Sequence, residues 1–507
     1  MPPSLNFTDV AVLTLGVASL AYVFQKRSPA PLPPGPRGWP IIGNILDMPT
    51  VQPWLGFKKW GEKWGNMVYV NLLGQPMVVL NSPKVAVDML DKKSSIYSDR
   101  PTFTMAGELV GWTNVTPFLH YGDTFRESRR LTHQIMGSKK SIQVFLPMVE
   151  RQTHRFIQRV SDDPEHVYEY IRGTAGAIIL NLAYGYEVKE DRDELVALVD
   201  EAMQQFSILT TPNAFLVDAF PILRHIPNWF PGATFKRLAI EYKKTLTDMA
   251  TVPFLYTKGQ VATGTAQPSF ASTLLENTEL TEEQEESIKW TAAALYGGGS
   301  DTTVSSIYTF FLAMTLYPEV QKKAQAELDT VVGTDRLPSP ADREHLPYVD
   351  ALVKEVYRWH PVGPLGLPHR LIQDDIHDGY FIPKGTVVIA NIWNILHDED
   401  TYQNPMAFDP ERFLSAPGKL PEQDPRAFSF GFGRRSCPGL NLAEASIFMS
   451  CAMVLSVFNI TKAVNGDGSV VTPSAEFQDG TVSHPKPFRC SIKPRSLKAE
   501  ALIHSAE

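Results

Sequence analysis

The stretch Phe430–Gly439 places one cysteine among glycines and arginines. Cys437 is followed by Pro438 and then by a long apolar run that begins at Leu440. Because proline is favoured at the first position of a helix, the pattern predicts that Cys437 is the N-cap of a helix. The positive end of a helix and its free N–H groups stabilise a thiolate, the form of cysteine that ligates iron. Cys437 is therefore a candidate iron ligand, and a buried structural cysteine is the alternative.

The residues around this cysteine suit a flat, acidic cofactor. Gly431, Gly433 and Gly439 have no side chain, so a planar group can approach the backbone closely. Arg435 lies two residues before the sulfur and can donate charge-assisted hydrogen bonds to an acidic group of that cofactor. A cysteine hydrolase is a competing interpretation, but no histidine lies near Cys437 in the sequence to act as its base.

Three consecutive glycines, Gly297–Gly299, lie inside a helical pattern from about Glu282 to Leu316. Each glycine in a helix interior costs about 1 kcal/mol relative to alanine, so a continuous helix here needs a compensating interaction. A loop between two helices is the ordinary interpretation of such a run.

An acid and a base stand three residues apart at Glu355 and Arg358, on one face of a predicted helix. Alone, such a pair indicates only a solvated ion pair worth a few tenths of a kcal/mol, of the order of ~0.3. A further arginine, Arg412, lies between this pair and Cys437.

Together these motifs resemble the cytochrome P-450 superfamily of haem-thiolate enzymes. The cysteine stretch matches the family's haem-binding pattern Phe-x-x-Gly-x-Arg-x-Cys-x-Gly at every fixed position, namely Phe430, Gly433, Arg435, Cys437 and Gly439. Chance gives such a match in well under about one chain in a thousand. The resemblance implies heme b as the cofactor and Cys437 as the axial ligand of its iron.

The same resemblance gives roles to the other motifs. The glycine run matches the family's oxygen-binding helix, which implies one long central helix, distorted where it crosses the haem. There Thr302 would hydrogen-bond the oxygen ligand, and Asp301 would supply protons through water. Glu355, Arg358 and Arg412 would form a buried structural triad.

Further residues are expected to contact the haem propionates. Residues 121–130 resemble the family's Trp-x-x-x-Arg helix, with Arg129 retained and Phe125 in place of tryptophan. Phenylalanine has no N–H donor, so one propionate hydrogen bond is expected to be lost. Arg100 and His369 match additional propionate partners in the family.

The implied activity is insertion of one oxygen atom of O2 into a lipophilic small molecule. Electrons would come from NADPH through a separate NADPH–cytochrome P-450 reductase, with cytochrome b5 as the other candidate donor. The expected docking face lies near Cys437, where a basic patch could form from Arg126, Arg129, Arg130 and Arg434.

Details around the glycine run resemble fungal members of secondary metabolism, similar to O-methylsterigmatocystin oxidoreductase, which favours a terpenoid or polyketide substrate. Seven apolar positions are expected to line the pocket: Phe103, Phe118, Ala293, Ala294, Val362, Leu365 and Val482. A reductase-independent isomerase or dehydratase is the alternative enzyme, and a haem sensor or carrier is a third hypothesis. The Asp301–Thr302 pair argues against the isomerase, which needs no protonation of oxygen.

Composition agrees with a folded enzyme and excludes other classes. The 507 residues are 43% hydrophobic and 20% charged, values typical of globular proteins. The net charge of −8 does not suggest a nucleic-acid-binding protein. Three cysteines without regular spacing form no disulfide framework, which indicates a reducing compartment. Cys451 and Cys490 are expected to be packed thiols.

Residues 1–27 are predicted to form a membrane anchor. Val10–Phe24 carries no charge, and Lys26 and Arg27 follow it. A spanning helix needs about 20 mainly apolar residues, and the basic flank places the large domain in the cytosol. The expected location is the endoplasmic reticulum membrane, with a single pass. A cleaved signal peptide fits less well, because no basic residue precedes the apolar run.

The remaining chain divides into a hinge and a catalytic domain. Residues 28–40 are rich in proline, which predicts a stiff, extended spacer. Residues 41–507 are expected to form the haem-thiolate domain. Its pattern predicts a hairpin over 67–80 that turns at Gly74–Pro76, helices over 83–332, strands over 379–393 with a turn at Pro383–Gly385, and short strands over 470–492. The predicted fold class is mainly α with a minor β portion: a cytochrome P-450 fold preceded by one transmembrane helix.

Overall fold

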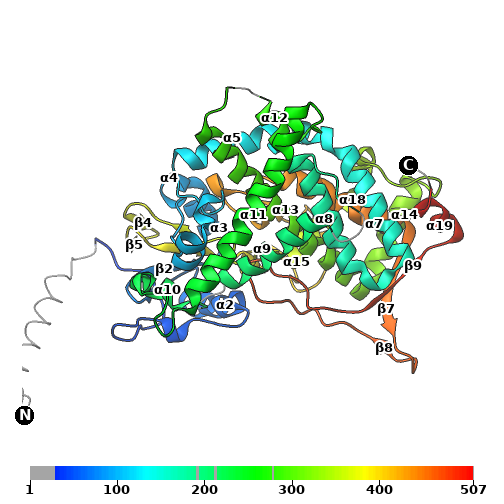
Figure 1. The fold of residues 1–507 in the computed structure, drawn as a ribbon. Helices are drawn as coiled ribbons and strands as arrows, with labels where there is room; N and C mark the ends of the chain where they lie inside the picture. The colour runs from blue at the N-terminus through cyan, green and yellow to red at the C-terminus, as the bar shows by residue number, and fades with distance from the viewer. Residues whose placement is uncertain (1–28, 190–192, 211–213, 277–278, 506–507) are drawn as a thin grey trace, which may run out of the picture.

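The computed structural model describes residues 29–189, 193–210, 214–276 and 279–505, so the predicted anchor at 1–27 lies outside the described residues. The described chain is mainly helical with small sheets at its margins, as the sequence predicted (Figure 1). The long helices are α2 (Pro53–Trp64), α5 (Asp123–Met136), α7 (Leu146–Asp162), α8 (Val167–Tyr184), α9 (Glu194–Thr210), α11 (Thr234–Thr263), α13 (Glu282–Leu316), α14 (Pro318–Val331), α15 (Pro347–Trp359) and α18 (Leu440–Val457).

Short helical segments join these elements. The α-helical ones are α3 (Pro83–Ala86), α4 (Ser94–Tyr97), α6 (Lys139–Ile142), α10 (Leu216–Ala219), α12 (Phe270–Leu275), α16 (Ile392–Ile395), α17 (Arg426–Ser429) and α19 (Leu497–Ile503). The connections also contain two π-helical segments, η2 (Val87–Lys92) and η3 (Thr104–Val110), and the 3-10 segments η7 (Pro221–His225), η9 (Pro410–Phe413) and η10 (Gly433–Arg435).

Helix α13 runs through the middle of the helical part and keeps its predicted limits (Figure 1). It is one continuous α-helix through Gly297–Gly299, which confirms the single long helix and excludes the alternative loop. Gly299 lies so close to α8 that a Cβ atom there would sit 2.8 Å from Cδ1 of Ile179. The tight contact between the two helices is the compensation that the glycine cost required.

Helix α18 follows the cysteine stretch and is almost entirely buried. Among the residues that the structure describes, it is the one helix long and apolar enough to cross a membrane, and 78% of that stretch is buried inside the domain. Its hydrophobic surface therefore belongs to the core, where it packs against α7, α13 and α15.

The larger sheet has the order β1–β2–β6–β3. Its strands are β1 (Met67–Leu72), β2 (Gln75–Leu80), β6 (Val387–Ala390) and β3 (His369–Arg370), and only the β2–β6 pair is parallel. The hairpin turn lies at Leu73 and Gly74, with φ of 52° and 88°, earlier than predicted. A turn with positive φ at both central residues matches the strand twist, so the hairpin closes there and Pro76 falls inside β2.

The strands expected over 379–393 and their turn at Pro383–Gly385 are confirmed, except that Trp393 lies in α16. β5 (Tyr380–Ile382) pairs with β4 (Asp375–His377) in a small sheet, whereas β6 joins the larger sheet. Near the C-terminus, β7 (Phe458–Val464) pairs with β8 (Val470–Val471) and β9 (Cys490–Pro494), which confirms the short strands expected over 470–492.

The described part of the proline-rich segment contains no helix, and it lies on the domain rather than apart from it. The carbonyl of Pro31 accepts a hydrogen bond from the N–H of Phe381 at 2.7 Å, and that of Pro34 accepts one from the N–H of Tyr69 at 2.9 Å. At Gly35 a Cβ atom would lie 1.9 Å from the carbonyl oxygen of Tyr69, so only glycine allows this approach. The segment is thus fastened to the sheet.

Candidate active site

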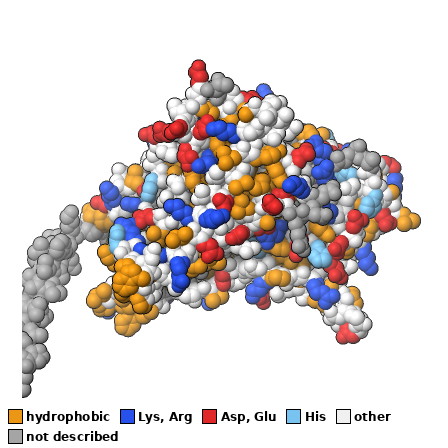
Figure 2. Space-filling view, in the orientation of Figure 1, with side chains coloured by type: hydrophobic (Ala, Val, Ile, Leu, Met, Phe, Trp, Pro, Cys, Tyr) orange, Lys and Arg blue, Asp and Glu red, His pale blue; other side chains and the backbone are white. Residues whose placement is uncertain are grey.

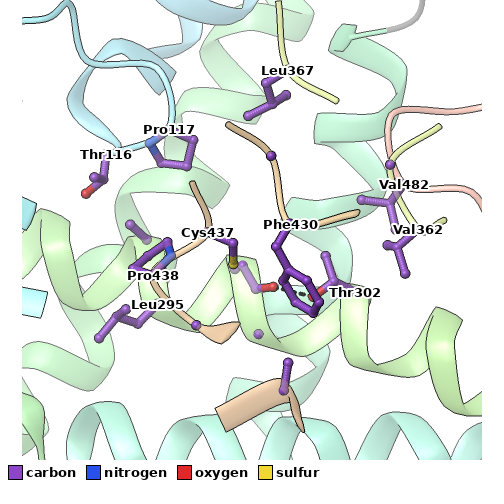
Figure 3. A pocket seen from close by; sticks show the side chains of 18 of the residues that line it. Thr116, Pro117, Leu295, Thr302, Val362, Leu367, Phe430, Cys437, Pro438 and Val482 are labelled. Carbon is purple, nitrogen blue, oxygen red and sulfur yellow. Dashed lines mark hydrogen bonds between the residues drawn. The ribbon is translucent and has the colours of Figure 1, made fainter. Parts of the chain in front are cut away.

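A cavity of about 400 Å³ lies where α13, α18, α5 and the 360s loop meet. Of the three cysteines in the chain, Cys437 is the one that lines it. In Figure 3, Cys437, Phe430 and Thr302 lie near the middle of the view, and Val362 and Val482 lie together at its right. Side chains that are far apart in the sequence therefore converge around one thiol.

The cysteine loop is held by hydrogen bonds at both ends. The N–H of Cys437 donates to the carbonyl of Phe430 at 2.7 Å, and the N–H of Gly433 donates to the carboxylate of Asp91 on η2. Gly433 has φ +52°, and a Cβ atom there would lie 2.3 Å from the carbonyl oxygen of Leu90. Glycine is therefore required at this position, both by its backbone conformation and by the contact with η2.

Cys437 is not the helix cap that the sequence predicted. The N-cap is Gly439, and α18 begins at Leu440. The N–H of Gly439 still hydrogen-bonds the sulfur, and this bond and the charge of Arg129 lower the pKa of Cys437, but burial has the larger effect and raises it. Coordination to a metal ion deprotonates a thiol outright, so bound iron would hold Cys437 as the thiolate.

Two buried arginines beside the cavity lack a carboxylate hydrogen-bond partner among the described residues. Arg100 donates to the carbonyls of Pro117, Leu367 and Pro368 at 2.7–2.9 Å. Arg435 donates to the carbonyls of Ser98 and Leu119, both at 2.7 Å, and more weakly to that of Thr116.

The charges of these arginines are poorly balanced. Burial, and then the charge of Arg435, lowers the pKa of Arg100 well below its usual value. Burial also lowers the pKa of Arg435 to about 10, although the nearby carboxylate of Asp99 raises it. Guanidinium groups remain charged in proteins, so these shifts express a cost that an acidic ligand would relieve.

Arg129 and His369 line the same cavity as these two arginines. Arg129 on α5 lines the cavity and donates to the carbonyl of Ser436 at 2.8 Å. His369 lines it as well, and its Nδ1 lies 2.8 Å from the carbonyl oxygen of Tyr97. In the protein without haem, burial and then the charge of Arg100 lower the pKa of His369. A carboxylate beside the ring would favour its protonated form, in which both nitrogens donate.

On α13 the two polar residues after the glycines face different ways. Thr302 lines the cavity, and its hydroxyl donates to the carbonyl of Gly298 at 2.7 Å. A Cβ atom on Gly298 would meet nothing within 4 Å, so the space over this turn is open. Asp301 does not line the cavity; its carboxylate pairs with Nε2 of His484 at 3.1 Å.

Comparison with known proteins decides the family. The sequence matches the family model described as cytochrome P-450 over residues 33–491. It is 54% identical to cytochrome P-450 monooxygenase 208 of Postia placenta, over 98% of this chain and 96% of that protein. The chain belongs to the cytochrome P-450 family.

Other relatives have the same character. Cytochrome P-450 monooxygenase claR of Ampulloclitocybe clavipes is 47% identical over 98% of this chain and 93% of its own length. Cytochrome P-450 monooxygenase ppsD of Aspergillus oryzae is 43% identical over 99% of this chain and 96% of its own length. This cytochrome P-450 is therefore a monooxygenase, an oxidoreductase of the fungal type.

Cytochrome P-450 proteins bind haem iron through a cysteine thiolate, and the residues present fit that group. Cys437 supplies the one thiol in the cavity, and Arg100, Arg435, Arg129 and His369 are the donors that haem propionates would satisfy. The unbalanced charge of the buried arginines is what the acidic groups of haem would neutralise.

Phe125 has a role in this cytochrome P-450 that the sequence did not suggest. Its ring is 3% exposed and lies under the guanidinium of Arg435, with Cζ 3.8 Å from the ring centroid. A cation over an aromatic face is attracted to it. The missing N–H donor is therefore accompanied by a contact that holds Arg435 in place.

The predicted triad lies behind the cysteine loop, away from the cavity. Arg358 donates to both oxygens of Glu355 at 2.7 and 2.8 Å, and Nε of Arg412 donates to Oε1 of Glu355 at 3.2 Å. All three side chains are at most 2% exposed. Arg412 also pairs with Glu422 at 2.6 Å, a fourth member that the motif did not indicate.

The cavity wall includes residues that were predicted and others that were missed. Six of the seven apolar candidates line it, whereas Phe103 stands behind Phe118 in an edge contact. The missed residues include aromatic, sulfur-bearing and hydroxyl-bearing side chains: Trp112, Met203, Phe206, Thr303, Ser306 and Thr481. Thr303 belongs to the motif on the central helix but was given no role, and the other five lie outside every motif, so the sequence held no signal for them.

Proposed function

We propose that this cytochrome P-450 inserts one oxygen atom of O2 into a terpenoid or polyketide of secondary metabolism, with electrons from NADPH. The observation that supports this most is the cavity itself, because it is mainly apolar and opens directly onto Cys437. The volume of about 400 Å³ is shared by the haem and the substrate, because Cys437, Arg129 and Arg435 line the same cavity as the apolar residues.

Each site residue has a distinct task in this proposal. When bound, haem supplies the activation of dioxygen. Cys437 ligates its iron, and Arg100, Arg129, Arg435 and His369 hold its propionates. Phe430, Gly433 and Gly439 shape the loop that presents the sulfur, and Phe125 orients Arg435.

Thr302 and Asp301 deliver protons to the cavity in this proposal. Thr302 is on the cavity side of α13, where its hydroxyl can donate to a ligand after leaving the carbonyl of Gly298. Asp301 is the neighbouring acid on the outer side and can pass protons towards Thr302 by a change of its side-chain rotamer.

The substrate contacts favour a hydrocarbon surface with few polar groups. Phe206 lies at the centre of an aromatic wall, 4.7 Å from Trp112 and 5.6 Å from Phe118 between ring centroids. Thr303, Ser306 and Thr481 also line the cavity and contribute hydroxyl groups to its wall. A largely apolar ligand with an occasional hydroxyl or carbonyl matches this lining.

We propose a separate NADPH–cytochrome P-450 reductase, or cytochrome b5, as electron donor, docking outside the cysteine loop. Arg434 is exposed there and contacts Tyr121. Arg126 and Arg130 pair with Asp123 and Glu127 on their own helix. Arg129 points inward to Ser436, so it does not belong to the basic patch expected from the sequence.

We propose attachment to the endoplasmic reticulum membrane, with the catalytic domain cytosolic. A group of exposed apolar side chains lies in the described part of the N-terminal region and around α10 and η7, visible at the lower left of Figure 2. It includes Trp39, Ile41, Leu216, Ile222 and Trp229. Apolar surface of this kind commonly marks contact with a protein or a membrane.

The difference spectrum of the reduced protein with and without carbon monoxide tests the core of this proposal. A strongly red-shifted Soret band is expected for iron bound by thiolate, and Cys437→Ser should abolish it. Cys490→Ser, which changes a cysteine outside the cavity, is the matched control. Retention of the red-shifted Soret band in Cys437→Ser would contradict the ligand assignment. Substrate-dependent NADPH consumption with added reductase, with terpenoids and polyketides as candidates, then tests the reaction.

A further inference from the structure

The carboxylate of Asp301 has a specific partner from the far end of the chain. Oδ1 of Asp301 lies 3.1 Å from Nε2 of His484, in the connection between β8 and β9. The two side chains are 25% and 11% exposed, so the pair is largely shielded from solvent. Nδ1 of His484 is buried and has no hydrogen-bond partner among the described residues. The imidazole therefore makes its one defined polar contact with Asp301.

The backbone around His484 is fixed against the walls of the cavity. The hydroxyl of Ser305 on α13 donates to the carbonyl of Ser483 at 2.5 Å. The N–H of Ser483 donates to the carbonyl of Val362, and the carbonyl of His484 accepts from the N–H of Gln478, both at 2.8 Å. Val482, which directly precedes Ser483 in the sequence, lines the cavity. The strap, residues Gln478–His484, forms part of the cavity wall and thus holds His484 beside Asp301.

The charges that face this pair come from several elements. Arg172 on α8 pairs with Asp200 on α9 at 2.8 Å, and both interact electrostatically with Asp301. Tyr168 on α8 contacts the imidazole edge-on, and burial raises the pKa of this tyrosine, so it is uncharged near neutral pH.

His360, after α15, also faces the strap, and burial lowers its pKa so that it is neutral. The remaining charges are therefore two carboxylates and one guanidinium. Without His484 this group has an excess of one negative charge, and a protonated His484 brings it to balance.

From this geometry we infer that His484 is a positioning residue that holds Asp301 on the outer side of α13 and supplies it with the proton that it passes to Thr302. The inference rests on the proposed roles of Asp301 and Thr302. It adds a member to the proton path, contributed by the C-terminal strap, that no motif indicates.

The transfer conserves protons and charge. The Nε2–H bond of the His484 imidazolium breaks and an O–H bond forms at Oδ1 of Asp301, which leaves a neutral imidazole and a neutral carboxylic acid. Asp301 turns towards the cavity and gives this proton up on the Thr302 side, becoming a carboxylate again. Nε2 of the neutral His484, which Asp301 has left free by turning away, regains a proton from hydronium in the solvent. Histidine exchanges protons readily near neutral pH, which suits it to this step.

His484→Gln separates proton supply from simple packing. Glutamine keeps an N–H donor for Asp301 but cannot be protonated. In the haem-loaded full chain with reductase, the wild-type ratio of product to peroxide should fall as pH rises, because only the protonated imidazole has a proton to give to Asp301. In His484→Gln this ratio should be lower by about tenfold at the acidic end and nearly independent of pH, since general acid groups contribute about 10²–10⁴-fold.

The matched control is His166→Gln, because His166 also pairs with an aspartate, Asp163 at 2.7 Å, but lies outside the cavity. It should behave like the wild type. If His484→Gln keeps the wild-type ratio and pH profile while its carbon monoxide spectrum is normal, the inference is overturned and the monooxygenase assignment stands. Loss of the thiolate spectrum in the wild type would instead overturn the proposed function.

A measurement without turnover tests the pair itself. Chemical unfolding midpoints of the haem-loaded protein are compared for His484→Gln, Asp301→Asn and the double variant. The shift of the double variant should be smaller than the sum of the single shifts, because contacting residues are energetically coupled. Additive shifts would mean that the two side chains do not interact in solution, which would also overturn the inference. Ser305→Ala, which loosens the strap but keeps the histidine, should lower the product ratio and retain its pH dependence.

Discussion

Phe125→Leu is predicted to weaken haem retention through Arg435. The ring of Phe125 lies 3.8 Å beneath the guanidinium, and both side chains are buried. Leucine keeps an apolar side chain of similar size but removes the aromatic face that attracts the cation. The guanidinium is then held only by its carbonyl partners, and haem binding has to supply the cost of ordering it.

The magnitude follows from that contact. A desolvated cation–π interaction is worth about 2 kcal/mol, and about 1.4 kcal/mol corresponds to a tenfold change in affinity. The affinity for haem should therefore fall by up to roughly 30-fold. Because affinity differences between related complexes appear mainly in dissociation, the change should be seen as faster release of haem.

The assay is transfer of haem from the variant to an excess of apomyoglobin, followed by absorbance. Phe103→Leu is the matched control, since Phe103 makes an edge contact with Phe118, does not line the cavity and has no guanidinium over its ring. Phe125→Leu should release haem much faster than Phe103→Leu. Equal rates for the two variants would refute the view that the ring acts through Arg435.

Three further predictions concern the loop, the oxygen side and the triad. Gly433→Ala should abolish haem incorporation, because its Cβ would meet the carbonyl oxygen of Leu90 at 2.3 Å. Gly466→Ala is the control and should incorporate haem normally, because no atom lies within 4 Å of a Cβ there. Normal incorporation in both variants would count against the argument. Thr302→Ala should divert NADPH from product to peroxide while Thr330→Ala does not, and unchanged coupling would remove Thr302 from the proton path. Glu355→Gln leaves two buried arginines without their shared charge and should cost about 3–5 kcal/mol in urea unfolding; a loss near that of a surface pair would contradict its structural role.

The elements of the fold were predictable where one physical signal dominates. The central helix keeps its predicted limits, because a long apolar pattern bounded by Thr281 as a side-chain cap specifies it. The pairing of the strands over 379–393 was not predictable, since their partners are β2, β3 and β4, and sequence pattern carries no information on long-range pairing. The start of α18 was misjudged because the bond from Cys437 to Phe430 closes the loop and delays the helix to Leu440.

At the site, the motifs located the residues around the sulfur but not their directions. Asp301 and Thr302 are adjacent in sequence, and α13 turns them to opposite sides, so only Thr302 lines the cavity. His484 lies far along the chain in a short-stranded region and carries no motif. Its position depends on bonds from Ser305 and Val362 to the strap, and these follow from tertiary packing alone.

Two buried arginines, Arg100 and Arg435, link haem binding to the stability of this cytochrome P-450. Arg100 and Arg435 are at most 9% exposed, donate only to carbonyl groups among the described residues, and repel one another. Asp99, the acid that offsets them, is itself engaged by His120 and by the N–H of Tyr121. Burying a charge without a counter-charge is costly, so the folded chain carries an electrostatic strain that the haem propionates remove. Any group that binds only the folded state adds its binding free energy to stability. Haem should therefore stabilise the region around η10 and α5 more than an uncharged ligand of equal contact area, and haem esterified at its propionates should stabilise it less.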